Sequence, residues 1–126
     1  LLPGAQLYLR DPSPPVSALR EAGVSMAVAT DLNPGSSPLL DPWIAATLSC
    51  VAMGLTIEEA LLGITRNAAR ALGRPDLGRL YMGGPADLVV VEPPPGEAAT
   101  PAALIQFMGG ARVRATVRGG ERLSFA

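Results

Sequence analysis

Hydrophobic positions cluster in a short run near the start of the chain, from Val24 to Thr30. The run is nearly continuous in apolar residues, which is typical of a strand buried in a parallel sheet. It ends at Asp31–Pro38, where proline and glycine prevent its continuation and short polar side chains can bond the local backbone. The pattern predicts a buried parallel strand that leads directly into a loop.

The middle of the chain has the spacing of helices. Asp41 and Pro42 can begin a helix whose strong helix formers continue until Gly54. A second helix is expected at once, because Thr56 and Glu59 have the spacing of a capping box. Its apolar positions recur every three or four residues and predict one helix that ends near residue 73. These positions are Ile57, Ala60, Leu61, Ile64, Ala68 and Leu72.

The last third of the chain changes to the period of strands. Leu88–Val91 is apolar and β-branched, and it ends at a proline-rich loop. Arg112–Arg118 alternates between polar and apolar residues before the turn at Gly119 and Gly120. We therefore expect a small sheet after the helices, and an α/β fold class for the whole chain.

Composition adds several exclusions. The 126 residues include 10 basic and 11 acidic side chains, and a net charge of −1 gives no reason to expect a nucleic-acid partner. No secretory signal is visible, and no run reaches the about 18 apolar residues of a membrane span. The chain also begins at Leu1 and not at Met, which raises the possibility of a fragment.

Histidine is absent and Cys50 is the single cysteine. The chain by itself therefore cannot form a Ser-His-Asp triad, a metal site with His ligands or an intramolecular disulfide. Cys50 lies in an apolar run, which favours a buried structural thiol in a reducing compartment.

The candidate chemistry lies in the loop after the first apolar run. At the C-terminal end of a parallel strand, Asp31 would face the region where barrels and open α/β sheets bind ligands. Such a carboxylate can bind a metal or accept a proton from metal-bound water. Asn33 to Ser36 offers backbone and side-chain donors to a ligand. A plain turn or helix cap explains the same residues at least as well.

Several segments together resemble the imidazolonepropionase family of the amidohydrolase superfamily. The most specific is Thr30–Pro38, which is similar to the family's signature at the end of its last barrel strand. Leu55–Leu61 and Thr65–Gly73 resemble the helix that follows the barrel in many amidohydrolases, and Gly78–Val90 resembles the return into their small β domain. These last signatures are superfamily-wide, so the loop alone selects the family.

The resemblance implies a fold for each part of the chain. Residues 1–76 would be the C-terminal end of a (β/α)₈ TIM barrel, comprising its last strand and the helices that follow. Residues 77–126 would be part of a small β-sandwich domain. Because a complete barrel needs about 250 residues, the chain would be the C-terminal portion of a longer, cytoplasmic enzyme.

The resemblance also implies roles for individual residues. Asp31 would be a metal ligand and would help activate the hydrolytic water, while Asn33, Gly35 and Ser36 would contact the substrate or product. The metal would be one zinc or iron ion, with its His ligands outside this chain. The implied reaction is hydrolysis of the ring C–N amide bond of 4-imidazolone-5-propanoate to N-formimidoyl-L-glutamate in histidine degradation.

The same resemblance implies the binding partners of the protein and leaves two alternative functions. We expect a small-molecule substrate and no binding to nucleic acid or to a membrane. Whether the full-length protein forms a homodimer is an open alternative. One alternative is another metal-dependent amidohydrolase, a cyclic amidase or a nucleobase deaminase. The other is a non-catalytic remnant or interaction module.

Overall fold

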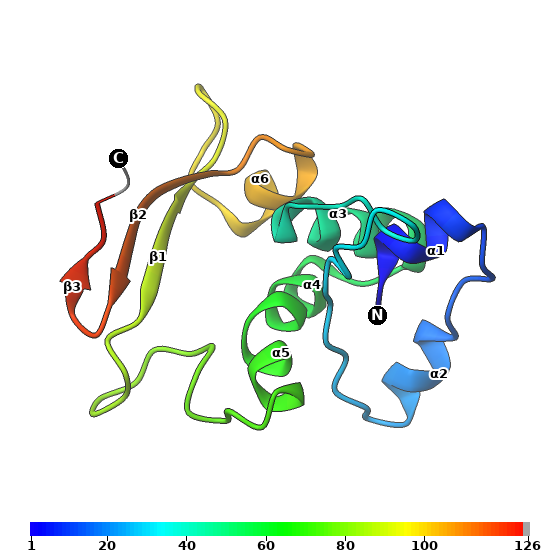
Figure 1. Cartoon of the computed structure of the whole chain (residues 1–126), viewed down its shortest axis with the longest axis horizontal. Helices are drawn as coiled ribbons and strands as arrows, with labels where there is room; N and C mark the ends of the chain where they lie inside the picture. Colours follow the sequence, from blue (N-terminus) through cyan, green and yellow to red (C-terminus); the bar gives the residue numbers. More distant parts are fainter. Residues whose placement is uncertain (125–126) are drawn as a thin grey trace.

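The computed structural model describes residues 1–124, which form a helical part and a small sheet at opposite ends of the molecule (Figure 1). The helices are α1 (Pro3–Leu9), α2 (Val16–Glu21), α3 (Pro42–Met53), α4 (Ile57–Ile64), α5 (Arg66–Ala71) and α6 (Pro101–Gln106). The strands are β1 (Leu88–Glu92), β2 (Arg112–Arg118) and β3 (Glu121–Arg122). The expected α/β class is confirmed. Within residues 1–124, no helix is long and apolar enough to cross a membrane.

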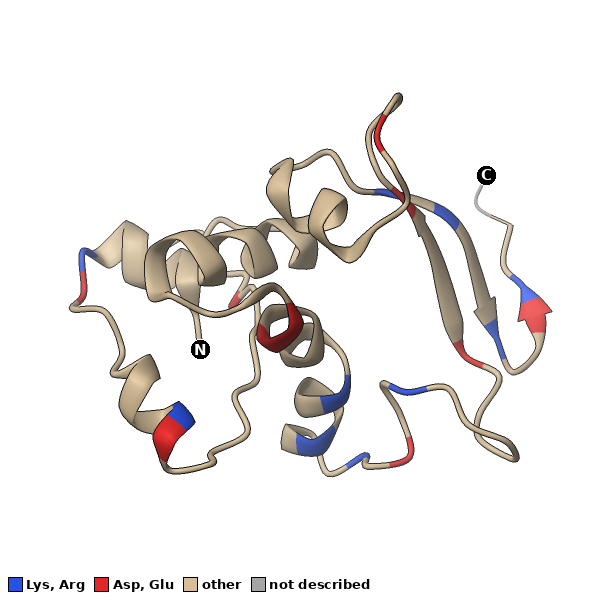
Figure 2. Cartoon of the chain, turned by 180° about the vertical axis from the view of Figure 1, so that it is seen from behind, with Lys and Arg blue, Asp and Glu red and all other residues tan. Residues whose placement is uncertain are grey.

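Helix α3 forms where the sequence predicts it, across the middle of the helical part. The Asp41 side chain accepts a hydrogen bond from the Trp43 N–H at 2.7 Å, and Pro42 takes the first helical position. Gly54 ends the helix in a left-handed conformation, φ 79°, which favours glycine. The helix carries no charged residue (Figure 2) and packs against α1, α4 and α6.

Small side chains let the helices approach one another closely. Ala45 and Ala46 of α3 and Ala60 of α4 are fully buried. A single core surrounds them and joins α2, α3, α4, α6 and the extended segment before the Asp31 loop. Its other buried apolar residues are Val16, Met26, Val28, Met53, Leu55 and Ile105.

The single helix predicted from about residue 56 to residue 73 is wrong, because the structure has two helices, α4 and α5. They are separated at Thr65, whose backbone is not helical (φ −122°, ψ −99°). The Thr65 hydroxyl donates to the Leu61 carbonyl at 2.6 Å, a bond that bends helices. The returning chain also packs here, since a Cβ on Gly78 would lie 2.6 Å from the Thr65 carbonyl. Helical spacing could not reveal this tertiary contact.

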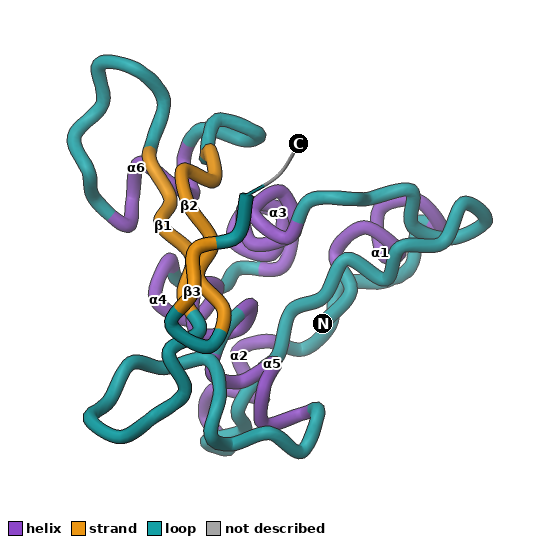
Figure 3. Tube along the Cα trace, turned by 60° about the vertical axis from the view of Figure 1, so that its left-hand side comes forward, coloured by secondary structure: helices purple, strands orange, loops and turns teal. Residues whose placement is uncertain are grey.

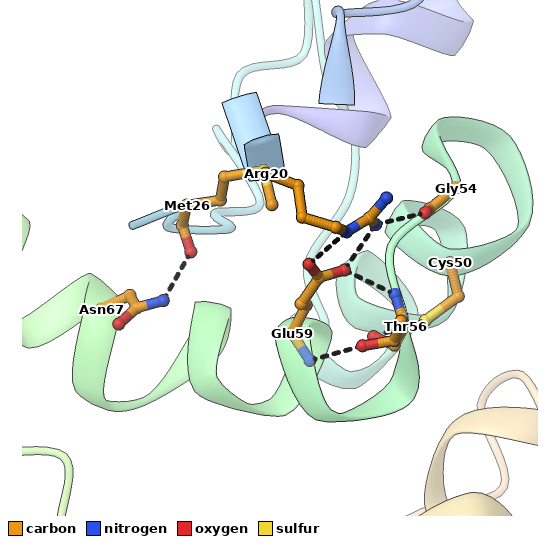
Figure 4. Close-up of polar contacts among 7 residues, drawn as sticks. All are labelled: Arg20, Met26, Cys50, Gly54, Thr56, Glu59 and Asn67. Atoms are coloured by element: carbon orange, nitrogen blue, oxygen red, sulfur yellow. Dashed lines mark hydrogen bonds and ion pairs between the residues drawn. The ribbon is translucent and has the colours of Figure 1, made fainter. Parts of the chain in front are cut away.

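The predicted capping box at the start of α4 is confirmed (Figure 4). The Glu59 N–H donates to the Thr56 hydroxyl at 3.1 Å, and the Thr56 N–H donates to the Glu59 carboxylate at 2.8 Å. Arg20 of α2 extends this network with two bonds of 2.7 Å to the same carboxylate and one of 3.0 Å to the Gly54 carbonyl. These bonds, from Arg20 above all, lower the pKa of Glu59 from 4.5 to about 2.

Cys50 lies beside this network and is half-buried (Figure 4). Its thiol donates to the Thr56 carbonyl at 3.6 Å, and burial raises the pKa of the Cys50 thiol above its ordinary value. The raised pKa disfavours the reactive thiolate. The residue is nevertheless less buried than the sequence predicted.

The sheet is antiparallel with the order β1-β2-β3 (Figure 3). Leu88 lies opposite Val117, and a bulge follows Val90. The strands predicted over Leu88–Val91 and Arg112–Arg118 are confirmed as β1 and β2, whereas the two-residue β3 was not predicted. Val90 is 47% exposed and Val113 is 55% exposed. Residues 1–124 therefore leave much of the apolar surface of this sheet uncovered.

Helix α6 was not predicted from the sequence. It lies between β1 and β2 along the chain, yet it packs against α3 and α4 (Figure 1). The Thr100 side chain caps it by accepting the Ala103 N–H at 3.2 Å. Ile105 is buried in the core, and its carbonyl accepts a 2.8 Å bond from the Thr47 hydroxyl. The second part of the chain therefore contributes directly to the core of the first.

The parallel strand expected over residues 24–30 is not formed, because this segment is extended but belongs to no sheet. Met26 and Val28 are buried, whereas Val24 is 48% exposed. A strand needs a hydrogen-bonded neighbour along its length. Residues 1–124 provide such a neighbour at one position only, at Leu1.

We predict that Glu59→Gln destabilises the full-length protein by about 1 kcal/mol at neutral pH, because it weakens the capping box and removes the ion pair. The pKa of Glu59 is lower in the folded state, so its carboxylate stabilises the fold fully above pH 4.5. This contribution is lost as the pH falls toward 2. Denaturant unfolding at several pH values should show the deficit of the variant shrinking over this range.

Glu58→Gln is the matched control, since Glu58 is the exposed neighbouring carboxylate in the same helical turn. It should leave the pH dependence of the free energy of unfolding nearly unchanged. Equal deficits for the two variants at every pH would contradict the role of Glu59.

Candidate functional site

The extended segment 24–30 carries the candidate loop, and one of its edges faces the first residue of the chain. The Leu1 nitrogen donates to the Ala27 carbonyl at 2.6 Å, and the Ala29 N–H donates to the Leu1 carbonyl at 3.1 Å. These two bonds flank Val28 and form the hydrogen-bonding pattern of neighbouring parallel strands. The segment thus has one position of the parallel pairing that the sequence predicted over its whole length.

The opposite edge of the segment is bound by helices. The Val28 N–H donates to the Gly63 carbonyl of α4 at 3.0 Å, and the Asn67 side chain of α5 donates to the Met26 carbonyl at 3.0 Å (Figure 4). Gly63 makes this approach possible, because a Cβ there would lie 2.7 Å from a methyl carbon of Val28. The segment is therefore held on both edges before it enters the loop.

The loop itself is closed by local hydrogen bonds. Asn33 and Ser37 form an antiparallel bridge, with the Asn33 N–H donating to Ser37 at 2.9 Å and the Ser37 N–H donating to Asn33 at 2.7 Å. The Asn33 side-chain oxygen accepts the Gly35 N–H at 2.8 Å, which forms an Asx turn. That oxygen is used within the turn, so the Asn33 amide NH₂ is the side-chain group left to meet a ligand.

Asp31 has an unusual backbone conformation at the start of this loop. Its φ of 50° lies in the left-handed region, which costs a residue other than glycine about 1 kcal/mol or more. The residue is exposed, and among residues 1–124 its carboxylate has no hydrogen bond or ion pair. The side chain is thus free to bind a ligand.

The structure brings the sequence-predicted residues together in one short loop. Asn33 and Gly35 are exposed, as Asp31 is, and Ser36 is half-buried. The residue that sequence reasoning missed is Ser37, whose side chain is fully buried and donates to the Thr30 carbonyl at 2.5 Å. A second serine in a polar loop gives no sign of burial, so the sequence contained no clear signal for it.

One carboxylate is a suitable ligand for zinc or iron, but it cannot hold the ion alone, because catalytic zinc sites use three protein ligands. Within residues 1–124, no group of three His, Cys, Asp or Glu side chains could bind a metal ion. Among the described residues, Asp31 therefore offers a single carboxylate ligand and no complete metal site.

An apolar hollow of about 450 Å³ lies elsewhere, between the sheet and the helical part. Trp43, Leu80 and Val89 are among its lining residues, and the Asp31 loop takes no part in it. This hollow and the candidate loop are separate features of the molecule.

Comparison with known proteins decides the family. Residues 1–123 match the pattern of the Amidohydrolase family. The chain belongs to the amidohydrolase family. Imidazolonepropionase of Maricaulis maris is 46% identical over 123 residues, covering 96% of this chain and 29% of the relative. Imidazolonepropionase of Cereibacter sphaeroides is 51% identical over 122 residues, covering 96% and 30%. The resemblance predicted from the loop and helix motifs is confirmed, and this amidohydrolase chain spans less than a third of these relatives.

Solved structures agree with the family. Adenosine deaminase from Xanthomonas campestris with bound zinc superposes with a TM-score of 0.80 at 27% identity, covering 96% of this chain and 30% of the other. Aminofutalosine deaminase from Helicobacter pylori also gives 0.80 at 27%, covering 98% and 31%. Guanine deaminase from E. coli, at 19% identity, covers 98% of this chain and 33% of its own with a TM-score of 0.77 and shows the fold alone.

We predict that Gly63→Ala destabilises the full-length amidohydrolase by about 1–3 kcal/mol, because the added methyl group overlaps Val28. In an ordinary helix interior the same change stabilises by roughly 0.5–1 kcal/mol, so the sign of the effect is diagnostic. Thermal or denaturant unfolding measures it. A more stable variant would show that α4 does not need this close approach.

Proposed function

We propose that this chain is the C-terminal part of a cytoplasmic imidazolonepropionase. The enzyme hydrolyses the ring C–N amide bond of 4-imidazolone-5-propanoate to N-formimidoyl-L-glutamate. The observation that carries the proposal is the identity of 46–51% to imidazolonepropionases over 96% of the chain. The exposed Asp31 carboxylate and its closed loop support it, because they offer a metal ligand beside polar groups that suit a substrate.

The proposal assigns a place to each part of the chain. Residues 1–76 belong to the end of a (β/α)₈ barrel, and residues 77–126 belong to a small β-sandwich domain. The parallel pairing of Leu1 with segment 24–30 supports the first assignment, because neighbouring strands of a (β/α)₈ barrel are parallel. The uncovered apolar surface of the sheet supports the second, because a sandwich would cover it.

Asp31 would hold one zinc or iron ion together with histidines from outside this chain. When bound, such an ion polarises a carbonyl and lowers the pKa of water to about 7. Asp31 would also accept the proton from the hydrolytic water. The Asn33 amide NH₂ and the Ser36 hydroxyl would donate hydrogen bonds to the propanoate or ring carbonyl, and Gly35 would allow the substrate to approach the backbone.

A deaminase is the second candidate, favoured by the likeness to adenosine and aminofutalosine deaminases at 27% identity. Both reactions attack a carbon bonded to nitrogen, so the substrate distinguishes them. The purified full-length protein should hydrolyse 4-imidazolone-5-propanoate, followed by its ultraviolet absorbance, and should release no ammonia from adenosine, guanine or aminofutalosine. The reverse result would favour a deaminase.

We predict that Asp31→Asn in the full-length protein lowers kcat/KM by at least about 100-fold, because the variant loses a metal ligand and the acceptor of the proton. The fold should persist, since asparagine tolerates the left-handed conformation at this position. Metal content by atomic emission, kcat/KM and the unfolding temperature together measure the effect.

Asp11→Asn is the control for this experiment, because Asp11 is also an exposed carboxylate but lies in the loop between α1 and α2. It should retain wild-type turnover and metal content. If Asp31→Asn behaves as this control does, Asp31 has no role in the reaction.

A further inference from the structure

We infer that Ser37 is a positioning residue for Asp31, so that its buried hydroxyl sets the metal affinity of the site. The inference rests on the proposed function, in which Asp31 is a metal ligand. Ser37 itself lies outside the set of residues that would touch metal or substrate. It acts through the backbone on both sides of Asp31.

Two hydrogen bonds from Ser37 bracket Asp31. The Ser37 hydroxyl donates to the carbonyl of Thr30, the residue before Asp31, at 2.5 Å. The Ser37 carbonyl accepts the N–H of Asn33, two residues after Asp31, at 2.9 Å. The backbone is therefore held on both sides of Asp31, at Thr30 and at Asn33. The left-handed conformation of Asp31, φ 50°, lies between these two bonds. Such a conformation persists where the surroundings hold it in place.

The hydroxyl of Ser37 is fixed in turn by helix α1. Ser37 is fully buried, and a Cβ on Gly4 of α1 would collide with its side-chain oxygen. The space between α1 and the loop thus accepts a small side chain and holds its oxygen in one place. A buried hydroxyl needs a partner, and the Thr30 carbonyl is the one it has.

The same bonds close the whole candidate loop. The contacts of Ser37 with Thr30 and Asn33 complete a ring that contains Asp31, Asn33, Gly35 and Ser36. Residues that orient a metal ligand without touching the metal commonly change metal affinity or activity by about 10–100-fold when replaced. Removing the Ser37 hydroxyl releases the backbone before Asp31 and so loosens the ligand.

Ser37→Ala and Ser49→Ala form a matched pair for the test in the full-length protein. Ser49 of α3 is also fully buried, and its hydroxyl donates to a backbone carbonyl, that of Ala46, at 2.7 Å. Both variants should lower the unfolding temperature to a similar degree. Ser37→Ala should also raise the zinc dissociation constant, measured by competition with a chelator, by about 10–100-fold. Ser49→Ala should change it less than about twofold, because the Ser49 hydroxyl bonds within α3 and holds no part of the Asp31 loop.

Cobalt substitution provides a readout of ligand geometry. The visible absorption bands of the cobalt-loaded protein should shift in Ser37→Ala and stay unchanged in Ser49→Ala. Gly4→Ala is a second variant, which keeps Ser37 but displaces its hydroxyl, and it should weaken zinc binding in the same direction. Wild-type zinc affinity and cobalt spectra in both Ser37→Ala and Gly4→Ala would overturn the inference.

Zinc affinity and cobalt spectra require no substrate, so this test is separate from that of the reaction. A wild-type protein that binds zinc but leaves 4-imidazolone-5-propanoate intact would refute the proposed reaction. The comparison of Ser37→Ala with Ser49→Ala would still decide the role of Ser37.

Discussion

The close approach of α4 to the extended segment 24–30 is the contact on which the rest of the structure depends. Gly63 has no side chain, so the helix reaches the segment and its carbonyl accepts the Val28 N–H at 3.0 Å. Burial of Val28 in the core adds the hydrophobic contribution. This contact fixes the segment that leads into Asp31. The position of the candidate loop therefore depends on α4.

Short helices surround this contact, and specific polar bonds compensate for their length. Isolated helices of six to eight residues are unstable in water, so each depends on caps and packing. Arg20 joins α2 to the start of α4 through Glu59, and Asn67 joins α5 to the backbone of the extended segment. The helical part is therefore a set of short pieces that are stable together.

In the proposed site, the loop would supply one part of the chemistry and residues outside this chain would supply the rest. It offers an unpaired carboxylate and a few polar donors, while α1 and Ser37 hold their backbone. No histidine is present in the sequence. The family relationship resolves this apparent conflict with a metal-dependent hydrolase, since the chain spans less than a third of the length of its relatives. The proposed function assigns this part of the protein one metal ligand, the Asp31 carboxylate.

The sequence by itself determined the features that depend on neighbouring residues. The Asp41 cap, the capping box of Thr56 and Glu59, strands β1 and β2 and the loop motif at Asp31 were all readable, because caps, alternation and turns are local. Tertiary structure decided the break at Thr65, the packing of α6 on α3, the missing strand over residues 24–30 and the buried bond of Ser37. Each of these depends on which distant segments pack together, such as Gly78 against Thr65 and Gly4 against Ser37. The pattern of one segment does not specify its partner.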